Sequence, residues 1–191
     1  MNKRIGILGG TFDPPHIGHA ILAEEARINL GLDLIWWIPN RIPPHKKKMS
    51  QTTNTDRWEM VRRLCQGHPN FELNTIELER EGPSYTVDTI KKLKHNHPET
   101  SLFFILGGDS IDTLAEWKNI EEISEMVTFV GMKRPGYQAK TELDIMIHLL
   151  DSPKINVSST LIREKIKTRT LNSFLLPKEV ASYIKERHLY E

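Results

Sequence analysis

The chain has 191 residues, a formal net charge of +1 at pH 7 and one cysteine, Cys65. Its share of hydrophobic residues, 38%, is typical of a globular protein, and its length fits one domain. The near-zero charge argues against a nucleic-acid-binding module and against recruitment to an anionic membrane. A lone cysteine excludes an intramolecular disulfide, and no apolar run is long enough to span a membrane. We therefore expect a cytoplasmic protein.

Short apolar segments alternate with helical patterns along the chain. Strands are expected at residues 4–8, 32–39, 71–78, 101–108, 126–131 and 155–160. Helices are expected over 20–30 with Gly31 as its stop, from 54 or 55, from the cap candidate Thr86, and from Pro177. This alternation predicts a doubly wound, Rossmann-like α/β fold, with a parallel sheet and helices on both faces. We expect one domain over residues 1–191, with a small helical extension from about 161 to 191.

The run "GGTFDPPHIGH" (Gly9–His19) follows the first expected strand and leads into a helix. Ligands of such folds bind at the carboxyl ends of the strands. The run is neither a P-loop nor a GxGxxG fingerprint. Its glycines allow close approach of the backbone, and the free amides at a helix start attract anions. His16 and His19, about one turn apart, add two hydrogen-bond donors, so the run suits a triphosphate.

Two other interpretations of the paired histidines remain open at this stage. They fit ordinary surface positions in a loop. They also fit part of a zinc site, but no third ligand stands at a telling spacing, so no metal ligand is predicted.

A second motif, "SSTLIR" (Ser158–Arg163), stands at another expected strand-to-helix turn. Ser158, Ser159 and Thr160 are cap candidates, which favours a second anion-binding helix start. Taken alone, Arg163 would be read as a solvated helix residue.

The two motifs together resemble the signatures of the HxGH nucleotidyltransferase superfamily. "HIGH" followed by "KMS" (Lys48–Ser50) also resembles class I aminoacyl-tRNA synthetases. In those enzymes the second motif lies far downstream, and this chain has no room for a tRNA-binding domain. We interpret the "KMS" match as accidental.

Three further stretches resemble one branch of the superfamily, the bacterial nicotinate-nucleotide adenylyltransferases: "IPNRIPPHKK" (Ile38–Lys47), "GPSYTVDTI" (Gly82–Ile90) and "FILGGDSIDTLAEWKN" (Phe104–Asn119). With the two motifs, the resemblance covers nearly the whole chain. It implies an enzyme of NAD biosynthesis that transfers AMP from ATP to nicotinate mononucleotide, giving deamido-NAD and pyrophosphate.

The resemblance and the residue chemistry together predict the nucleotide site. The expected ATP-binding residues are Gly9, Gly10, Thr11, Phe12, His16, His19, Gly107, Asp109, Ser158, Ser159, Thr160 and Arg163. Among them His16, His19 and Arg163 are the expected catalytic residues, which neutralise charge on the α-phosphate and the leaving pyrophosphate. Asp109 suits ribose hydroxyls, and Asp13 suits orientation of the loop. Magnesium is expected to arrive mainly on ATP oxygens and water.

The expected acceptor-binding residues are Thr11, Lys46, Tyr85, Thr86 and Trp117. Trp117 can stack on a pyridine ring, and the helix start at Tyr85 and Thr86 can bind its carboxylate. Lys46 lies in a basic loop and suits the acceptor phosphate. Each assignment has a structural alternative. Trp117 could pack in the core, Tyr85 and Thr86 could simply cap a helix, and Lys46 could lie in a solvated loop.

Other functions remain open from the sequence. Nicotinamide mononucleotide and phosphopantetheine are alternative acceptors within the superfamily. A non-catalytic nucleotide sensor is the main rival from another class. The partners expected are ATP and the acceptor, without nucleic acid or membrane, and a homo-oligomer is compatible with the sequence.

Overall fold

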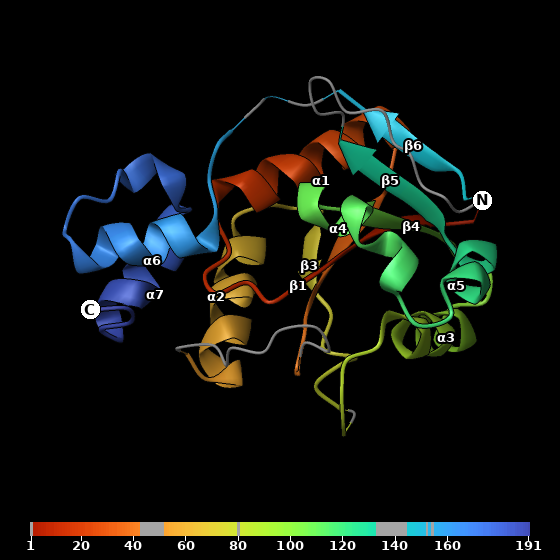
Figure 1. Ribbon diagram of the computed structural model, residues 1–191, viewed down its shortest axis with the longest axis horizontal. Helices are drawn as coiled ribbons and strands as arrows, with labels where there is room; N and C mark the ends of the chain where they lie inside the picture. The colour runs from red at the N-terminus through yellow and green to blue at the C-terminus, as the bar shows by residue number, and fades with distance from the viewer. Residues whose placement is uncertain (1, 43–51, 80, 133–144, 152, 154) are drawn as a thin grey trace.

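The computed structural model describes residues 2–42, 52–79, 81–132, 145–151, 153 and 155–191. Within these ranges the strands form one six-stranded sheet with the order β3-β2-β1-β4-β5-β6, in which every neighbouring pair is parallel. The order reverses its direction between β1 and β4, which is the doubly wound arrangement (Figure 1). The predicted parallel sheet is confirmed.

The three central strands are apolar because both of their faces are covered. β1, β2 and β4 each contain an uninterrupted run of buried residues, as parallel strands between two helical layers require. The strands are β1 (Arg4–Gly10), β2 (Leu34–Pro39), β3 (Phe71–Leu73), β4 (Ser101–Leu106), β5 (Thr128–Met132) and β6 (Ile147–Leu150).

Helices cover both faces of the sheet and form two separate hydrophobic cores. One core holds buried residues of α1, α2, α6 and α7, and the other holds those of α3, α4 and α5. The helices are α1 (Ile17–Leu30), α2 (Asn54–Gln66), α3 (Thr86–Asn96), α4 (Gly108–Asp112), α5 (Ile120–Met126), α6 (Ser159–Lys167) and α7 (Lys178–Glu186), with 3-10 turns η1 (Leu114–Glu116) and η2 (Ser173–Leu175). None of these helices is long and apolar enough to cross a membrane.

The helix ends follow the local sequence closely. Gly31 ends α1 in the left-handed conformation, with φ of 57°, as predicted. Ser158 accepts a hydrogen bond from the Leu161 amide and caps α6. The expectation for Thr86 is wrong, because Tyr85 occupies the N-cap position and Thr86 is the first helical residue of α3.

The predicted strand 71–78 is too long, and the one at 155–160 is absent. β3 ends at Leu73 because the Asn74 side chain accepts a hydrogen bond from the Ile76 amide and turns the chain. Residues 155–157 form the approach to α6, and the last strand is β6 instead. Strand-forming residue types alone did not distinguish this approach from a strand.

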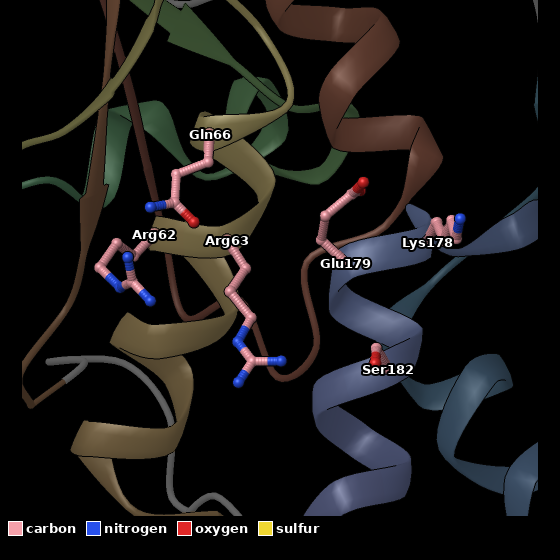
Figure 2. A pocket seen from close by; sticks show the side chains of 6 residues that line it. All are labelled: Arg62, Arg63, Gln66, Lys178, Glu179 and Ser182. Carbon is pink, nitrogen blue, oxygen red and sulfur yellow. The ribbon is translucent and has the colours of Figure 1, made fainter.

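Helix α7 packs on α2, and the C-terminal helices lie at the opposite end of the molecule from β6 (Figure 1). Figure 2 shows α2 and α7 side by side, with Arg63 extending from α2 toward α7. Arg63 pairs with Glu186 at 2.9 Å, and its guanidinium lies over the Tyr183 ring at 4.7 Å from the centroid. Helices α6 and α7 confirm the predicted helical character of the last part of the chain.

Candidate active site

The two predicted motifs meet at the point where the strand order reverses. β1 and β4 are neighbours, and both end at the same edge of the sheet, where α1 and α4 begin. The crevice outside these strand ends is where ligands bind in doubly wound folds. Gly107, directly after β4, faces open space: an added Cβ would have no described atom within 4 Å. The backbone there is accessible to a ligand.

The turn between β1 and α1 has a specific shape. Phe12 is buried with φ of 51°, a left-handed conformation that few non-glycine residues adopt. Its ring lies against the edge of the His19 ring, with 5.2 Å between the centroids. A Cβ on Gly10 would lie 3.0 Å from the same Phe12 ring, so glycine is favoured there. The Asp13–Pro14 peptide bond is cis. Phe12 therefore packs under the turn as a core residue and contacts a catalytic candidate.

The imidazoles of His16 and His19 stack on each other. Their centroids are 3.7 Å apart, and the His19 Nδ1 accepts a hydrogen bond of 3.2 Å from the His16 backbone amide. His16 is only 6% exposed, and burial lowers its pKa to about 4. His16 is therefore neutral at pH 7, which avoids repulsion between two stacked imidazolium rings. Its Nδ1 is buried and has no hydrogen-bond partner among the described residues.

Gly18, between the two histidines, makes room for the second motif. A Cβ at this position would lie 2.7 Å from Val157 Cγ1 and 3.1 Å from His16 Nδ1. Any larger residue would push α1 away from the segment that leads into α6. The sequence pattern did not reveal this packing role.

The second motif binds directly to the first turn. Ser159 Oγ donates to the Pro14 carbonyl at 2.9 Å, and Arg163 Nη1 donates to the Asp13 carbonyl at 2.7 Å. Arg163 Nη2 also contacts Thr160 Oγ1 at 3.2 Å. Residues about 150 positions apart are thus joined by hydrogen bonds. The structure places all three predicted catalytic residues around one turn.

Three of the predicted acceptor residues, Tyr85, Thr86 and Trp117, lie on two segments that contact each other. The Trp117 ring meets Phe104 of β4 edge-on, with centroids 5.4 Å apart. Lys118 Nζ lies 4.4 Å from the centroid of the Tyr85 ring, which brings the start of α3 to the Trp117 segment. Tyr85, Thr86 and Trp117 are each partly exposed. Trp117 therefore combines a packing contact with an accessible surface.

The loop after β2 is fastened to the same segment. Ser84 is buried, and its Oγ accepts hydrogen bonds from the amides of Arg41 and Ile42 at 3.1 and 3.3 Å. Lys46, the predicted phosphate-binding lysine of this loop, lies outside the described residues. The side chain of Asp109 also lies outside them.

Arg57 is a site residue that the sequence analysis missed. It is 1% exposed and donates to the Thr11 and Asn40 carbonyls, both at 2.7 Å. It also donates to the Asn54 side chain. One buried guanidinium thus joins the turn predicted to bind the nucleotide to the loop predicted to bind the acceptor. The sequence did contain an indication of its burial. Arg57 recurs at helical intervals with Met60, Val61 and Leu64, which form the buried face of α2.

The part of the chain that the structure describes contains no group of three or more His, Cys, Asp or Glu residues arranged to hold a metal ion. These residues therefore offer no protein-only metal centre. Magnesium brought by the nucleotide stays a prediction.

Comparisons with known proteins agree with this geometry. The model of the cytidylyltransferase-like family matches residues 7–165. A probable nicotinate-nucleotide adenylyltransferase of Bacillus pumilus (strain SAFR-032) is 49% identical over 189 residues, and the nicotinate-nucleotide adenylyltransferase of Bacillus subtilis (strain 168) is 45% identical, with 99% of each chain covered in both. The Plasmodium falciparum nicotinic acid mononucleotide adenylyltransferase complexed with NaAD shares the fold, with a TM-score of 0.80 at 21% identity over 99% of this chain and 98% of that one. The chain belongs to the nicotinate-nucleotide adenylyltransferase family.

Proposed function

We propose that this chain transfers the adenylyl group of ATP to nicotinate mononucleotide at the edge of the sheet formed by β1 and β4. The products are deamido-NAD and pyrophosphate. The observation that carries the proposal is the pair of stacked imidazoles at the start of α1, with Arg163 hydrogen-bonded to the same turn. Relatives that are 45–49% identical over 99% of the chain carry the name of this activity.

The nucleotide side supplies charge neutralisation without a general base. The acceptor phosphate is already an anion, so one of its oxygens attacks the α-phosphorus of ATP in line. A new P–O bond forms as the bond to the bridging oxygen breaks, and pyrophosphate leaves with the electron pair. His16, neutral at pH 7, donates through an N–H. Arg163 carries the permanent charge that stabilises the leaving group.

The amides of the first turn of α1 point along its axis and favour phosphate oxygens. Gly9, Gly10 and Thr11 are proposed to approach the phosphates through their backbone. Magnesium would supply further neutralisation on ATP oxygens, with water completing its coordination.

The acceptor side supplies a flat surface and a helix start. The exposed part of Trp117 is proposed to stack on the pyridine ring, and the amides at the start of α3, at Tyr85 and Thr86, to bind the ring carboxylate. Lys46 is proposed to meet the acceptor phosphate. An amide-bearing ring would lose the charge attraction at α3, which is the physical basis for preferring nicotinate.

Pyrophosphate release with ATP and magnesium tests the proposal, using nicotinate mononucleotide, nicotinamide mononucleotide and phosphopantetheine in separate reactions. Release with the nicotinate form at a rate far above the other two is expected. A preference for another acceptor would keep the nucleotide site and overturn the acceptor assignment. Bound ATP without release in any reaction would identify a non-catalytic nucleotide sensor. A cytoplasmic location and a homo-oligomer stay predictions from the sequence.

A further inference from the structure

The end of the chain contacts the turn that carries the catalytic histidine. Tyr190, the residue before the last, is 6% exposed, and its hydroxyl donates to Asp13 Oδ1 at 2.7 Å. Asp13 stands three residues before His16 in the turn between β1 and α1. The transfer mechanism described above assigns no task to this contact. It links the two ends of the chain, 177 positions apart.

The backbone of the last residues adopts uncommon conformations to reach this position. Tyr190 has φ of 68°, in the left-handed region that bulky residues rarely occupy, and His188 has φ of 50°, in the same region, which histidine adopts more often. Such conformations persist where surrounding contacts determine them, and they concentrate at functional sites. The Tyr190 ring belongs to the same hydrophobic core as Phe12, and its hydroxyl lies 4.0 Å from Met60 Sδ. The tail is thus held firmly against the turn.

Asp13 is the point where several segments meet. Its Oδ1 accepts from Tyr190 and also from Thr52 Oγ1 at 2.6 Å, while its backbone carbonyl accepts from Arg163. Arg163 Nη1 additionally lies 3.9 Å from Asp13 Oδ2. Burial and the adjacent Asp13 carboxylate raise the pKa of Tyr190 above its ordinary value, so the phenol keeps its proton and remains a donor.

We propose that Tyr190 is a positioning residue for adenylyl transfer, which holds Asp13 so that its carbonyl stays aligned with Arg163 and the turn presents His16 to the nucleotide. Tyr190 itself touches no reacting atom. This inference rests on the proposed function, because the proposed function assigns Arg163 and His16 to the nucleotide phosphates. It gives the C-terminal extension a role in the chemistry as well as in the hydrophobic core.

A matched control lies on the same extension. The Tyr183 hydroxyl donates to Asp56 Oδ1 at 2.8 Å, and Tyr183 is 7% exposed. Both bonds join a buried C-terminal phenol to a buried carboxylate. Asp56, however, accepts from the Thr53 amide at the start of α2 and does not belong to the catalytic turn. Tyr183→Phe therefore removes the same chemistry at a site that should not affect catalysis.

Steady-state kinetics of Tyr190→Phe and Tyr183→Phe test the proposal. Both variants should lower the melting temperature by similar amounts. Tyr190→Phe should also lower kcat/KM for ATP by about ten- to a hundredfold, the scale of a small misplacement of reacting groups, whereas Tyr183→Phe should stay near wild type. The KM for nicotinate mononucleotide should change little in either. Equal kinetic effects of the two variants, or an unchanged Tyr190→Phe enzyme, would overturn the assignment.

Two further measurements separate this inference from the proposed function. Thr52→Val removes the second hydroxyl donor to Asp13 Oδ1 and should lower kcat/KM for ATP in the same direction; no change would argue against Asp13 as the point of action. The rise in melting temperature caused by ATP and magnesium, without acceptor, should be smaller in Tyr190→Phe than in Tyr183→Phe. If wild type shows this rise but transfers to none of the three acceptors, the proposed function fails, and the comparison of thermal shifts then decides only whether Tyr190 orders the turn for nucleotide binding.

Discussion

The predicted site has two parts that are held together by different contacts. The nucleotide side is the turn between β1 and α1 with the start of α6, and the acceptor side is the loop after β2 with the start of α3 and Trp117. On the nucleotide side, Ser159 and Arg163 donate hydrogen bonds from α6 to carbonyls of the first turn. On the acceptor side, an aromatic edge contact joins Trp117 to Phe104, and a cation lies over the Tyr85 ring. Hydrogen bonds also hold the backbone of the loop after β2, through Ser84, but the ring surface proposed to meet the acceptor is shaped by less directional contacts.

The difference matches what each side must do. In-line attack at a phosphorus atom depends on alignment, and an error of about 1 Å can cost about a hundredfold in rate. Hydrogen bonds to a charged donor such as Arg163 are short and orientation-dependent, so they preserve that alignment. Recognition of a flat ring needs an accessible surface and tolerates small lateral shifts. Variants on the two sides should therefore change different kinetic constants.

The largest effect is expected from His19→Ala. The stacked ring that contacts both His16 and Phe12 is lost, and with it a donor proposed to face the α-phosphate. By analogy with removal of one oxyanion donor, kcat should fall by about 10²–10³. Pyrophosphate release at saturating ATP and acceptor measures this change. Near-normal turnover would exclude His19 from the chemistry, and an unchanged circular dichroism spectrum would serve as the folding control.

Arg57→Met should weaken the binding of both substrates, because Arg57 donates hydrogen bonds to both the nucleotide side and the acceptor side. The variant removes the buried donor to the Thr11 and Asn40 carbonyls. Each lost buried donor costs about 1–3 kcal/mol, so the free energy of unfolding should fall by about 3 kcal/mol. The KM values for ATP and for the acceptor should both rise. Urea unfolding and separate titrations of the two substrates check this, and a rise confined to one KM would contradict the bridging role.

His16 should make stability depend on pH between about 4 and 6.5. Its pKa in the folded state is lowered by burial to about 4, so the unfolded chain binds more protons in this interval. The stabilisation is complete above pH 6.5 and is lost as the pH falls toward 4. From pH 7 to pH 5 the free energy of unfolding should drop by about 2 kcal/mol more than in His16→Gln. Parallel stability curves for wild type and variant would show that His16 titrates normally.

The local sequence was enough to predict much of the fold. Gly31 as a stop, Ser158 as a cap and the apolar run of β4 each depend on residues close in the chain. The predicted strand boundaries were wrong where a single side-chain contact or the position in the sheet determines whether residues form a strand. The Asn74 side chain ends β3, and β6 was missed because edge position and partial burial leave its residues without a clear strand pattern.

The predicted site likewise contains residues that the sequence identified and supporting contacts that it did not. The sequence predicted His16, His19 and Arg163 through motif resemblance, and the structure brings them to one turn. The contacts that support them were hidden, because no local pattern pairs Asp13 with Tyr190 across the length of the chain. Arg57 was visible in principle, since a charged residue on the apolar face of α2 must have buried partners. Finding those partners required the fold.

The smallest effect is expected from Trp117→Ala, on the acceptor side. Losing the indole removes the proposed stacking surface and the edge contact with Phe104. An aromatic pair of this kind contributes about 0.5–1.5 kcal/mol. The KM for nicotinate mononucleotide should rise by about three- to tenfold, and the KM for ATP should stay near wild type. Trp117→Phe keeps an aromatic face and should recover most of the acceptor affinity. Equal changes in both KM values, unrelieved by phenylalanine, would make Trp117 a packing residue and leave the acceptor ring to another surface.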